Sequence, residues 1–283
     1  MKRNRKWMNV LCFALALIVG IGFTAVVSMD PVAAAGGKKT VYVVKSIKIT
    51  ENGKTTTTKV KYNKNGTLKS IYDPREDETM TFKYGKKGQI KSFKDAYGAR
   101  YGNWTEKRSY TWKKGKLTKI KGSRGGDDTF TYTFKYKKGK IVSSKDVEKW
   151  KDNGGGSRTL NSKYTYKKGH ITRSNNTDKV GKATFKSTTN QKLDKKGNVI
   201  SIATTQNNRR FGGYYTAKIK YKKGRVSSME TVDWIPPYGD NIPKCTKQIT
   251  YKKIKVKDSL VKKVKAQQWK LVNNSKSLTD FAW

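Results

Sequence analysis

The sequence predicts an all-β fold, an antiparallel meander of about eight repeated β-hairpins that forms a curled sheet or a partly closed barrel. Three observations predict it. A short phrase recurs seven times: an aromatic residue or leucine, two or three polar residues, a glycine and an aliphatic residue. Successive turn glycines lie 22 residues apart from Gly66 to Gly88 and 30 apart from Gly139 to Gly169, the period of a repeated supersecondary unit. Flanking residues alternate between apolar and polar, as in strands.

Each copy of the phrase is expected to form one hairpin. The copies span Tyr62–Leu68, Tyr84–Ile90, Trp112–Leu117, Tyr136–Ile141, Tyr166–Ile171, Leu193–Val199 and Tyr221–Val226, and a degenerate eighth copy follows at Tyr251–Val256. In the short form Lys138 and Gly139 make a two-residue loop, so that Tyr136 faces Ile141 across the strands. In the long form Lys64–Gly66 make a three-residue loop, and Tyr62 faces Leu68. Glycine is expected because these turns require a positive φ.

A second aliphatic residue often stands three places after the first. Examples are Ile71, Phe93, Ile120, Ile202 and Met229. A spacing of three breaks the strict alternation of a strand, so it indicates either a β-bulge or a strand that is apolar on both faces. The sequence leaves these two alternatives open.

The phrase resembles the YD repeat of RHS-type and teneurin-type surface proteins, whose motif runs roughly Tyr-x-Tyr-Asp-x-x-Gly-Arg-Leu-x-x-Ile. Residues 62–71 match it well, and Leu193–Val199 keeps the aspartate, at Asp194. The resemblance covers about residues 42–256. It departs from the family pattern in that the other copies lack the aspartate, four copies are one residue shorter, and the period is longer. Members of that family form β-shells, so the resemblance implies a secreted bacterial hairpin-repeat protein.

The first 35 residues read as a secretory signal peptide, with a basic start, an apolar stretch and Ala33–Ala35 before Gly36. An uncleaved anchor is the alternative, because the apolar stretch nears spanning length. Residues 36–283 are then one domain, secreted or at a bacterial cell surface, with one cysteine, Cys245. From 257 to 283 the pattern fits either weak strand alternation or a helix on Leu260, Val264 and Trp269.

The formal net charge of +44 indicates an anionic partner. Hairpin tips of a meander lie along one edge of the sheet, and here they are rich in lysine. The predicted function is therefore a non-catalytic binding protein that contacts a cell-wall polymer, an acidic glycan or extracellular DNA through this edge. The predicted polyanion-binding residues are Lys86, Lys87, Lys113, Lys114, Lys137, Lys138, Lys167, Lys168, Lys222 and Lys223.

The opposite edge is expected to carry long loops with most of the acidic residues and several aromatic residues. The alternative function is a structural or adhesion module that binds a protein or a neutral glycan through these loops. The predicted partner-binding residues are Trp104, Trp150, Trp234 and Tyr238. A structural alternative is that the aromatic side chains fold back and cap the open end of the sheet.

No catalytic motif and no metal-binding spacing occurs in the sequence, so we expect no enzyme, no cofactor and no metal. The single histidine, His170, follows a turn glycine and has no partner motif. A hydrolase of envelope polymer that uses two loop carboxylates is the least favoured alternative, because carboxylates require no sequence motif.

Overall fold

The computed structural model describes residues 37–273 except 87, 100–101, 126, 152–154, 168–169, 196–197, 207–213 and 235–243. The predicted signal peptide, residues 1–35, lies outside the described residues, and so does the segment 274–283. Within the described residues no helix is long and apolar enough to cross a membrane.

Among the described residues, sixteen antiparallel strands and one helix follow one another along the chain. They are β1 (Lys38–Glu51), β2 (Lys54–Tyr62), β3 (Leu68–Asp73), β4 (Glu78–Tyr84), β5 (Ile90–Tyr97), β6 (Thr105–Lys113), β7 (Lys116–Arg124), β8 (Asp128–Lys137), β9 (Lys140–Trp150), β10 (Gly156–Lys167), β11 (His170–Val180), β12 (Ala183–Leu193), β13 (Val199–Gln206), β14 (Tyr214–Lys222), β15 (Arg225–Trp234), β16 (Lys244–Lys257) and α2 (Asp258–Asn273).

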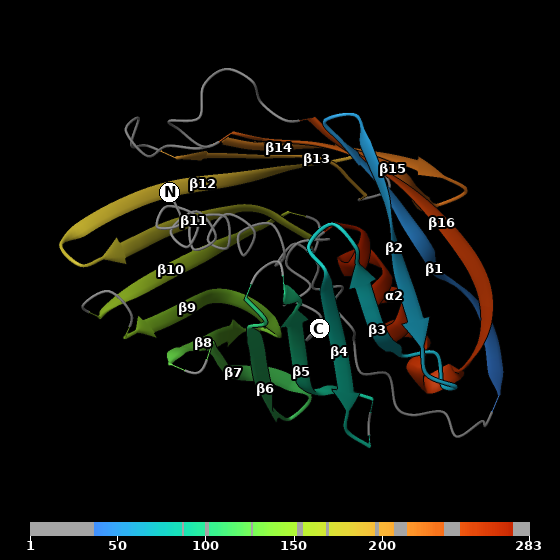
Figure 1. Cartoon of the computed structure of the whole chain (residues 1–283), viewed down its shortest axis with the longest axis horizontal. Coiled ribbons are helices and arrows are strands. Elements are labelled where there is room, and N and C mark those ends of the chain that lie inside the picture. The colour runs from blue at the N-terminus through green and yellow to red at the C-terminus, as the bar shows by residue number, and fades with distance from the viewer. Residues whose placement is uncertain are drawn as a thin grey trace.

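The sheet closes completely. Each strand pairs with its neighbours in sequence, and β1 pairs with β16 from Lys38 opposite Lys257 to Glu51 opposite Cys245. Figure 1 shows these two strands side by side, the first in blue and the last in orange-red. The predicted all-β meander is confirmed, and the partial closure expected from the sequence is complete closure, which leaves no sheet edge.

The predicted hairpin register is confirmed at the tips. Tyr62 lies opposite Leu68, and Tyr136 lies opposite Ile141. The pairing then skips one residue in the returning strand, so that Lys61 lies opposite Ser70. The same shift recurs at the other tips with described pairing, for example between Thr111 and Trp112. The bulge, one of the two alternatives, therefore explains the spacing of three, because it returns the second aliphatic side chain to the inner face.

The eighth copy of the phrase is not a hairpin. β16 runs straight through it, and Tyr251 lies opposite Val44 of β1. A register shift between Val44 and Ser46 repeats the bulge of the other tips. The first strand therefore supplies the returning half of the last repeat, which explains why this copy needs no turn glycine. Seven hairpins and one split repeat close the barrel.

A ladder of aromatic hydrogen bonds joins successive repeats. At each described rung the tip aromatic donates to the carbonyl of the aliphatic residue in the preceding repeat, at 2.7–3.1 Å. The rungs are Tyr62 to Val44, Tyr84 to Leu68, Trp112 to Ile90, Tyr136 to Leu117, Tyr166 to Ile141, Tyr221 to Val199 and Tyr251 to Val226. The phrase thus encodes contacts between repeats as well as the turn within each.

Helix α2 starts at the tip end of β16 and packs on the inner side of the wall (Figure 1). A Cβ built on Gly88 would lie 2.5 Å from Leu260, so the first turn lies under a hairpin tip. Farther along, the Gln268 side chain accepts hydrogen bonds from the amide of Val44, at 2.7 Å, and from the Tyr62 hydroxyl, at 3.0 Å. The helical alternative for this segment is confirmed over Asp258–Asn273, and it covers the interior at the tip end.

Candidate ligand site inside the barrel

The strands separate a charged interior from a basic exterior by simple alternation. Along β6 the inward side chains are Glu106, Arg108, Tyr110 and Trp112, and along β8 the exposed outward ones include Thr129, Thr133, Lys135 and Lys137. Among the described residues the exposed large hydrophobic side chains are Tyr42 and Ile200. The outer face is therefore a lysine and threonine surface without an apolar band in the part that the structure describes.

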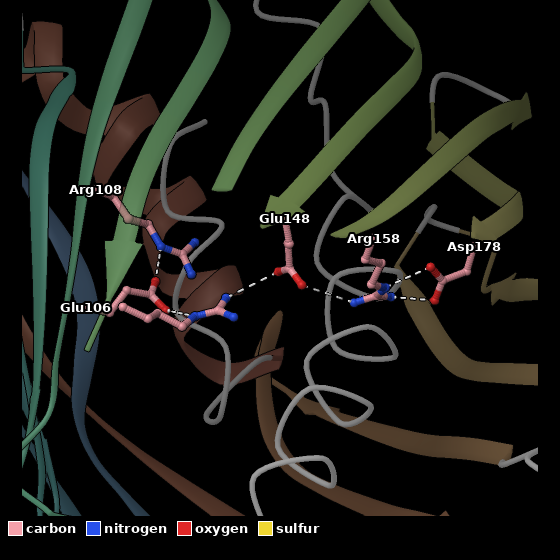
Figure 2. Close-up of polar contacts among 6 residues, drawn as sticks. Glu106, Arg108, Glu148, Arg158 and Asp178 are labelled. Carbon is pink, nitrogen blue, oxygen red and sulfur yellow. Dashed lines mark hydrogen bonds and ion pairs between the residues drawn. The ribbon is translucent and has the colours of Figure 1, made fainter. Parts of the chain in front are cut away.

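A chain of ion pairs follows the inner wall from β6 to β11 (Figure 2). Glu106 pairs with Arg108 on its own strand and with Arg124 on β7, the latter at 2.5 Å. Glu148 on β9 lies 3.5 Å from Arg124 and 3.6 Å from Arg158 on β10. Arg158 closes the chain with two hydrogen bonds of 2.7 Å to Asp178 on β11.

The positive and negative charges in this chain of ion pairs balance one another. Burial alone would raise the pKa of Glu106, but the guanidinium groups of Arg108 and Arg124 outweigh it and hold that pKa below its ordinary value. The pKa of Arg108 and that of Arg124 are raised, because their carboxylate partners outweigh the cost of burial. Glu106 therefore stays ionised in the interior between Arg108 and Arg124.

Asp146 is the fourth carboxyl group of this region and stands apart from the chain. It is 3% exposed, and neither of its carboxyl oxygens has a hydrogen-bond partner among the described residues. Burial and the nearby charge of Glu148 raise its pKa well above the ordinary value, and three arginines lower it only in part. It lies opposite Tyr132 of β8, whose buried hydroxyl also has no hydrogen-bond partner in the part of the chain that the structure describes.

A second carboxyl pair lies on the inner wall at β4 and β5. Glu78 and Asp95 are 2% and 4% exposed and share a hydrogen bond. Burial raises the pKa of both groups, to about 7 for Asp95, and their mutual repulsion adds to the increase for Glu78. The pair therefore holds one proton at neutral pH, as close carboxyl groups do when they cannot both ionise.

Small polar side chains line the inner wall from β10 to β13. Thr189 and Thr204 share a hydrogen bond of 2.8 Å, and Asn176 donates to the Ser187 hydroxyl at 3.3 Å. Other polar atoms of this wall are buried and have no hydrogen-bond partner among the described residues: Ser174 Oγ, Asn176 Oδ1 and Gln191 Oε1. The interior also holds apolar clusters, the largest of which includes Ile47, Met80 and Ile219. The interior therefore combines apolar clusters with buried polar and charged groups.

The predicted polyanion-binding lysines lie at the hairpin tips, apart from this inner wall. Lys86, Lys113, Lys114, Lys137, Lys138, Lys167, Lys222 and Lys223 are exposed there, while Lys87 and Lys168 lie outside the described residues. Other tip cations cover tip aromatics: the ammonium of Lys116 lies 5.5 Å from the ring centre of Tyr136, and that of Lys140 lies 5.2 Å from that of Tyr166.

The predicted aromatic loop residues take structural positions where they are described. Trp104 stacks on Tyr97 with ring centres 4.1 Å apart, and the Trp150 ring lies over Gly156, within 2.5 Å of a built Cβ. This agrees with the alternative that these side chains fold back onto the sheet. Tyr238 lies outside the described residues, as does the side chain of Trp234.

The sequence reasoning missed the charged interior because it assigned the acidic residues to loops. Glu106, Asp146, Glu148 and Asp178 belong to strands and point inward. A signal was present: Glu106 and Arg108 are in phase with Tyr110 and Trp112, so period-two alternation places all four on one face. No group of His, Cys, Asp or Glu suited to a metal ion occurs among the described residues.

The chain matches no protein-family model, and no curated protein is similar to it in sequence. Two similar solved structures are porin-like proteins. One, from Bacteroides vulgatus ATCC 8482, shares 10% identity over 74% of this chain and 98% of that chain, with a TM-score of 0.49. The other, from Bacteroides uniformis ATCC 8492, shares 16% identity over 74% of this chain and 96% of that chain, with a TM-score of 0.44. Both likenesses are weak, and closure of the barrel rests on the pairing of β1 with β16.

Two predictions are wrong. The resemblance to the YD repeat does not extend to the fold, because the sheet closes on itself into a barrel. The predicted function, polyanion binding along a straight edge of hairpin tips, is wrong as well, because closure of the sheet bends the row of tips into a ring. The tips instead form a rim around the end that α2 enters.

Proposed function

We propose that this chain is a non-enzymatic, extracytoplasmic binding protein that holds a small polar ligand against the inner wall of its barrel. The observation that carries the proposal is the set of buried, unpartnered polar atoms on the wall from β9 to β12. A buried polar atom without a partner costs about 1–3 kcal/mol, so a ligand that supplies the missing hydrogen bonds is stabilised there.

The size of the barrel supports this proposal. In barrels of about sixteen strands the wall side chains alone do not fill the interior. Helix α2 occupies the side of β1 and β16 at the tip end, far along the wall from the polar strands β9 to β12. An interior that combines apolar clusters with a few buried polar groups also fits the usual composition of a small-molecule site, which is mostly apolar with a few placed polar groups.

The outer face supports an aqueous location. A barrel that spans a lipid bilayer shows an apolar band to the lipid, and one lysine at the bilayer midplane costs roughly 2–4 kcal/mol. The described outer face instead exposes lysine and threonine along its strands. We therefore propose that the barrel stands in water outside the cytoplasm.

The test compares two neighbouring asparagines with opposite orientation. The mature protein is screened by thermal unfolding with neutral sugars, amino acids, alkylamines, dicarboxylates and nucleotides. Asn176→Leu changes a buried inner side chain, whereas Asn175→Leu changes an exposed outer one. A ligand of the lumen raises Tm by several degrees at about 100 times its Kd, and this increase is lost in Asn176→Leu and kept in Asn175→Leu. The proposal is contradicted if no class raises Tm, or if the increase survives in Asn176→Leu.

A further inference from the structure

Resting on the lumenal site proposed above, we propose that its ligand is a small organic primary ammonium ion seated on the Asp146 carboxylate, with its alkyl part against Tyr132 and Leu160. Charge on the inner wall leads to this choice. From β6 to β11 the ion-pair chain uses Glu106, Glu148 and Asp178 to match Arg108, Arg124 and Arg158. Asp146 is the carboxyl group of this region that takes no part in the chain of ion pairs.

The geometry at Asp146 suits an ammonium group. Both carboxyl oxygens and the Tyr132 hydroxyl are buried hydrogen-bonding atoms that have no partner within the described ranges of the chain. A primary ammonium has three N–H donors, which can serve two carboxylate oxygens and one phenol oxygen. The phenol keeps its proton, because burial raises the pKa of Tyr132 well above its ordinary value, yet its oxygen still accepts a hydrogen bond.

The surroundings of Asp146 favour an organic cation over a bare metal ion. Across the strands it lies opposite Tyr132 on one side and Leu160 on the other, which are 2% and 4% exposed. An aromatic ring and a leucine offer apolar contact to an alkyl chain and a π face to a cation. A divalent metal ion requires several oxygen ligands, and the described residues hold no such group of carboxylates.

Binding is coupled to one proton. The charged and titratable groups that face Asp146 are Arg108 of β6, Arg124 of β7, Tyr132 of β8, Glu148 of its own strand and Arg158 of β10. Without a ligand, burial favours the neutral acid form of Asp146, because it raises the pKa of that group well above its ordinary value. The ammonium ion then displaces the carboxyl proton to solvent, an ion pair forms, and the net charge of the site is unchanged. Affinity for the ammonium ion therefore rises with pH.

The experiment is titration calorimetry of the mature protein with n-butylammonium and with the neutral isostere n-butanol, at pH 6 and pH 8 in two buffers of different ionisation enthalpy. Butylammonium is expected to bind more tightly at pH 8 and to release protons at pH 6, while butanol binds more weakly. Asp146→Asn keeps the shape of the side chain and is expected to reduce butylammonium affinity about 30-fold or more. Asp258→Asn, the same change at an exposed pair with Lys39, is the matched control and retains full affinity.

The outcomes separate this inference from the proposed function. If butylammonium fails to bind, or binds Asp146→Asn equally well, the ammonium site is refuted. A neutral ligand that still depends on Asn176 would then leave the lumenal site standing. Folding of Asp146→Asn is checked by thermal unfolding, where the variant is expected to match or exceed the parent at pH 8, because it removes a buried ionisable group.

Discussion

At the scale of single residues, burial alone does not decide which inner carboxyl groups ionise. Glu106 and Asp146 are both almost fully buried, at 1% and 3% exposure. Glu106 contacts two guanidinium groups directly, and its pKa falls. Asp146 has arginines near but none bonded to it, and its pKa rises. Direct hydrogen bonds to the charged form therefore separate a stable buried ion from a group free to respond to a ligand.

The Glu78–Asp95 pair predicts that the barrel loses stability as pH rises through neutrality. Burial raises the pKa of Asp95 from its ordinary 3.8 to about 7, so the folded state keeps a proton that the unfolded chain releases. This contribution is fully present below about pH 4 and is lost as pH rises through about 7. Urea unfolding between pH 4 and pH 8 is expected to show this decline, and Glu78→Gln is expected to flatten it. A decline of the same size in Glu78→Gln would show that other groups cause it.

A second prediction concerns the lysine of the two-residue turns. Lys114, Lys138 and Lys223 have φ of 47°, 49° and 49°, a left-handed backbone that asparagine adopts more readily than lysine. Lys138→Asn is therefore expected to stabilise the barrel by up to about 1 kcal/mol. Lys137→Asn, outside the loop, is expected to give no gain in the same thermal unfolding measurement. Equal effects of the two substitutions would contradict the turn assignment.

At the scale of the elements, the sequence predicted the hairpins because their determinants are local. A glycine in the turn and an aromatic–aliphatic pair beside it are separated by a few residues, so Tyr62 and Leu68 could be paired without a structure. The bulge stayed one of two alternatives because only the pairing shows which residue is skipped. The helix stayed one of two alternatives as well, since Gln267 and Gln268 accept hydrogen bonds from strands that lie 199 and 224 residues away in sequence.

The aromatic ladder predicts a cost for losing one hydroxyl. Tyr136→Phe removes the 2.9 Å hydrogen bond to the Leu117 carbonyl but keeps the ring. Stability is expected to fall by about 1 kcal/mol in urea unfolding, the usual contribution of such a bond. Tyr42→Phe is the matched control, because Tyr42 is 41% exposed on the outer face. If the two variants are equally stable, the ladder adds nothing between repeats.

At the scale of the whole molecule, the chain carries most of its positive charge outside, and the arginines that it buries pair with Glu106, Glu148 and Asp178. The net charge of +44 follows from composition, but its distribution does not, because distribution depends on which face each strand buries. Complete closure of the barrel was not predicted for a related reason: β1 and β16 stand at opposite ends of the sequence repeats, so no local pattern indicates that they pair. One sign of this pairing is present in the sequence. Val44-Lys-Ser-Ile47 has the pattern of the returning strand Leu68-Lys-Ser-Ile71, but no turn precedes it.

Everything inferred about the lumen depends on the seam between β1 and β16, so a disulfide across it is the most direct test. The hydroxyl oxygens of Ser46 and Thr250 lie 2.7 Å apart across the seam. In a Cys245→Ala background of the mature protein, Ser46→Cys with Thr250→Cys is expected to form an intramolecular disulfide rapidly under mild oxidation. Ser46→Cys with Ser109→Cys, on β6, is expected to form none. Failure of the first pair to cross-link in folded monomer would mean that the meander is open, and the closed barrel would be refuted.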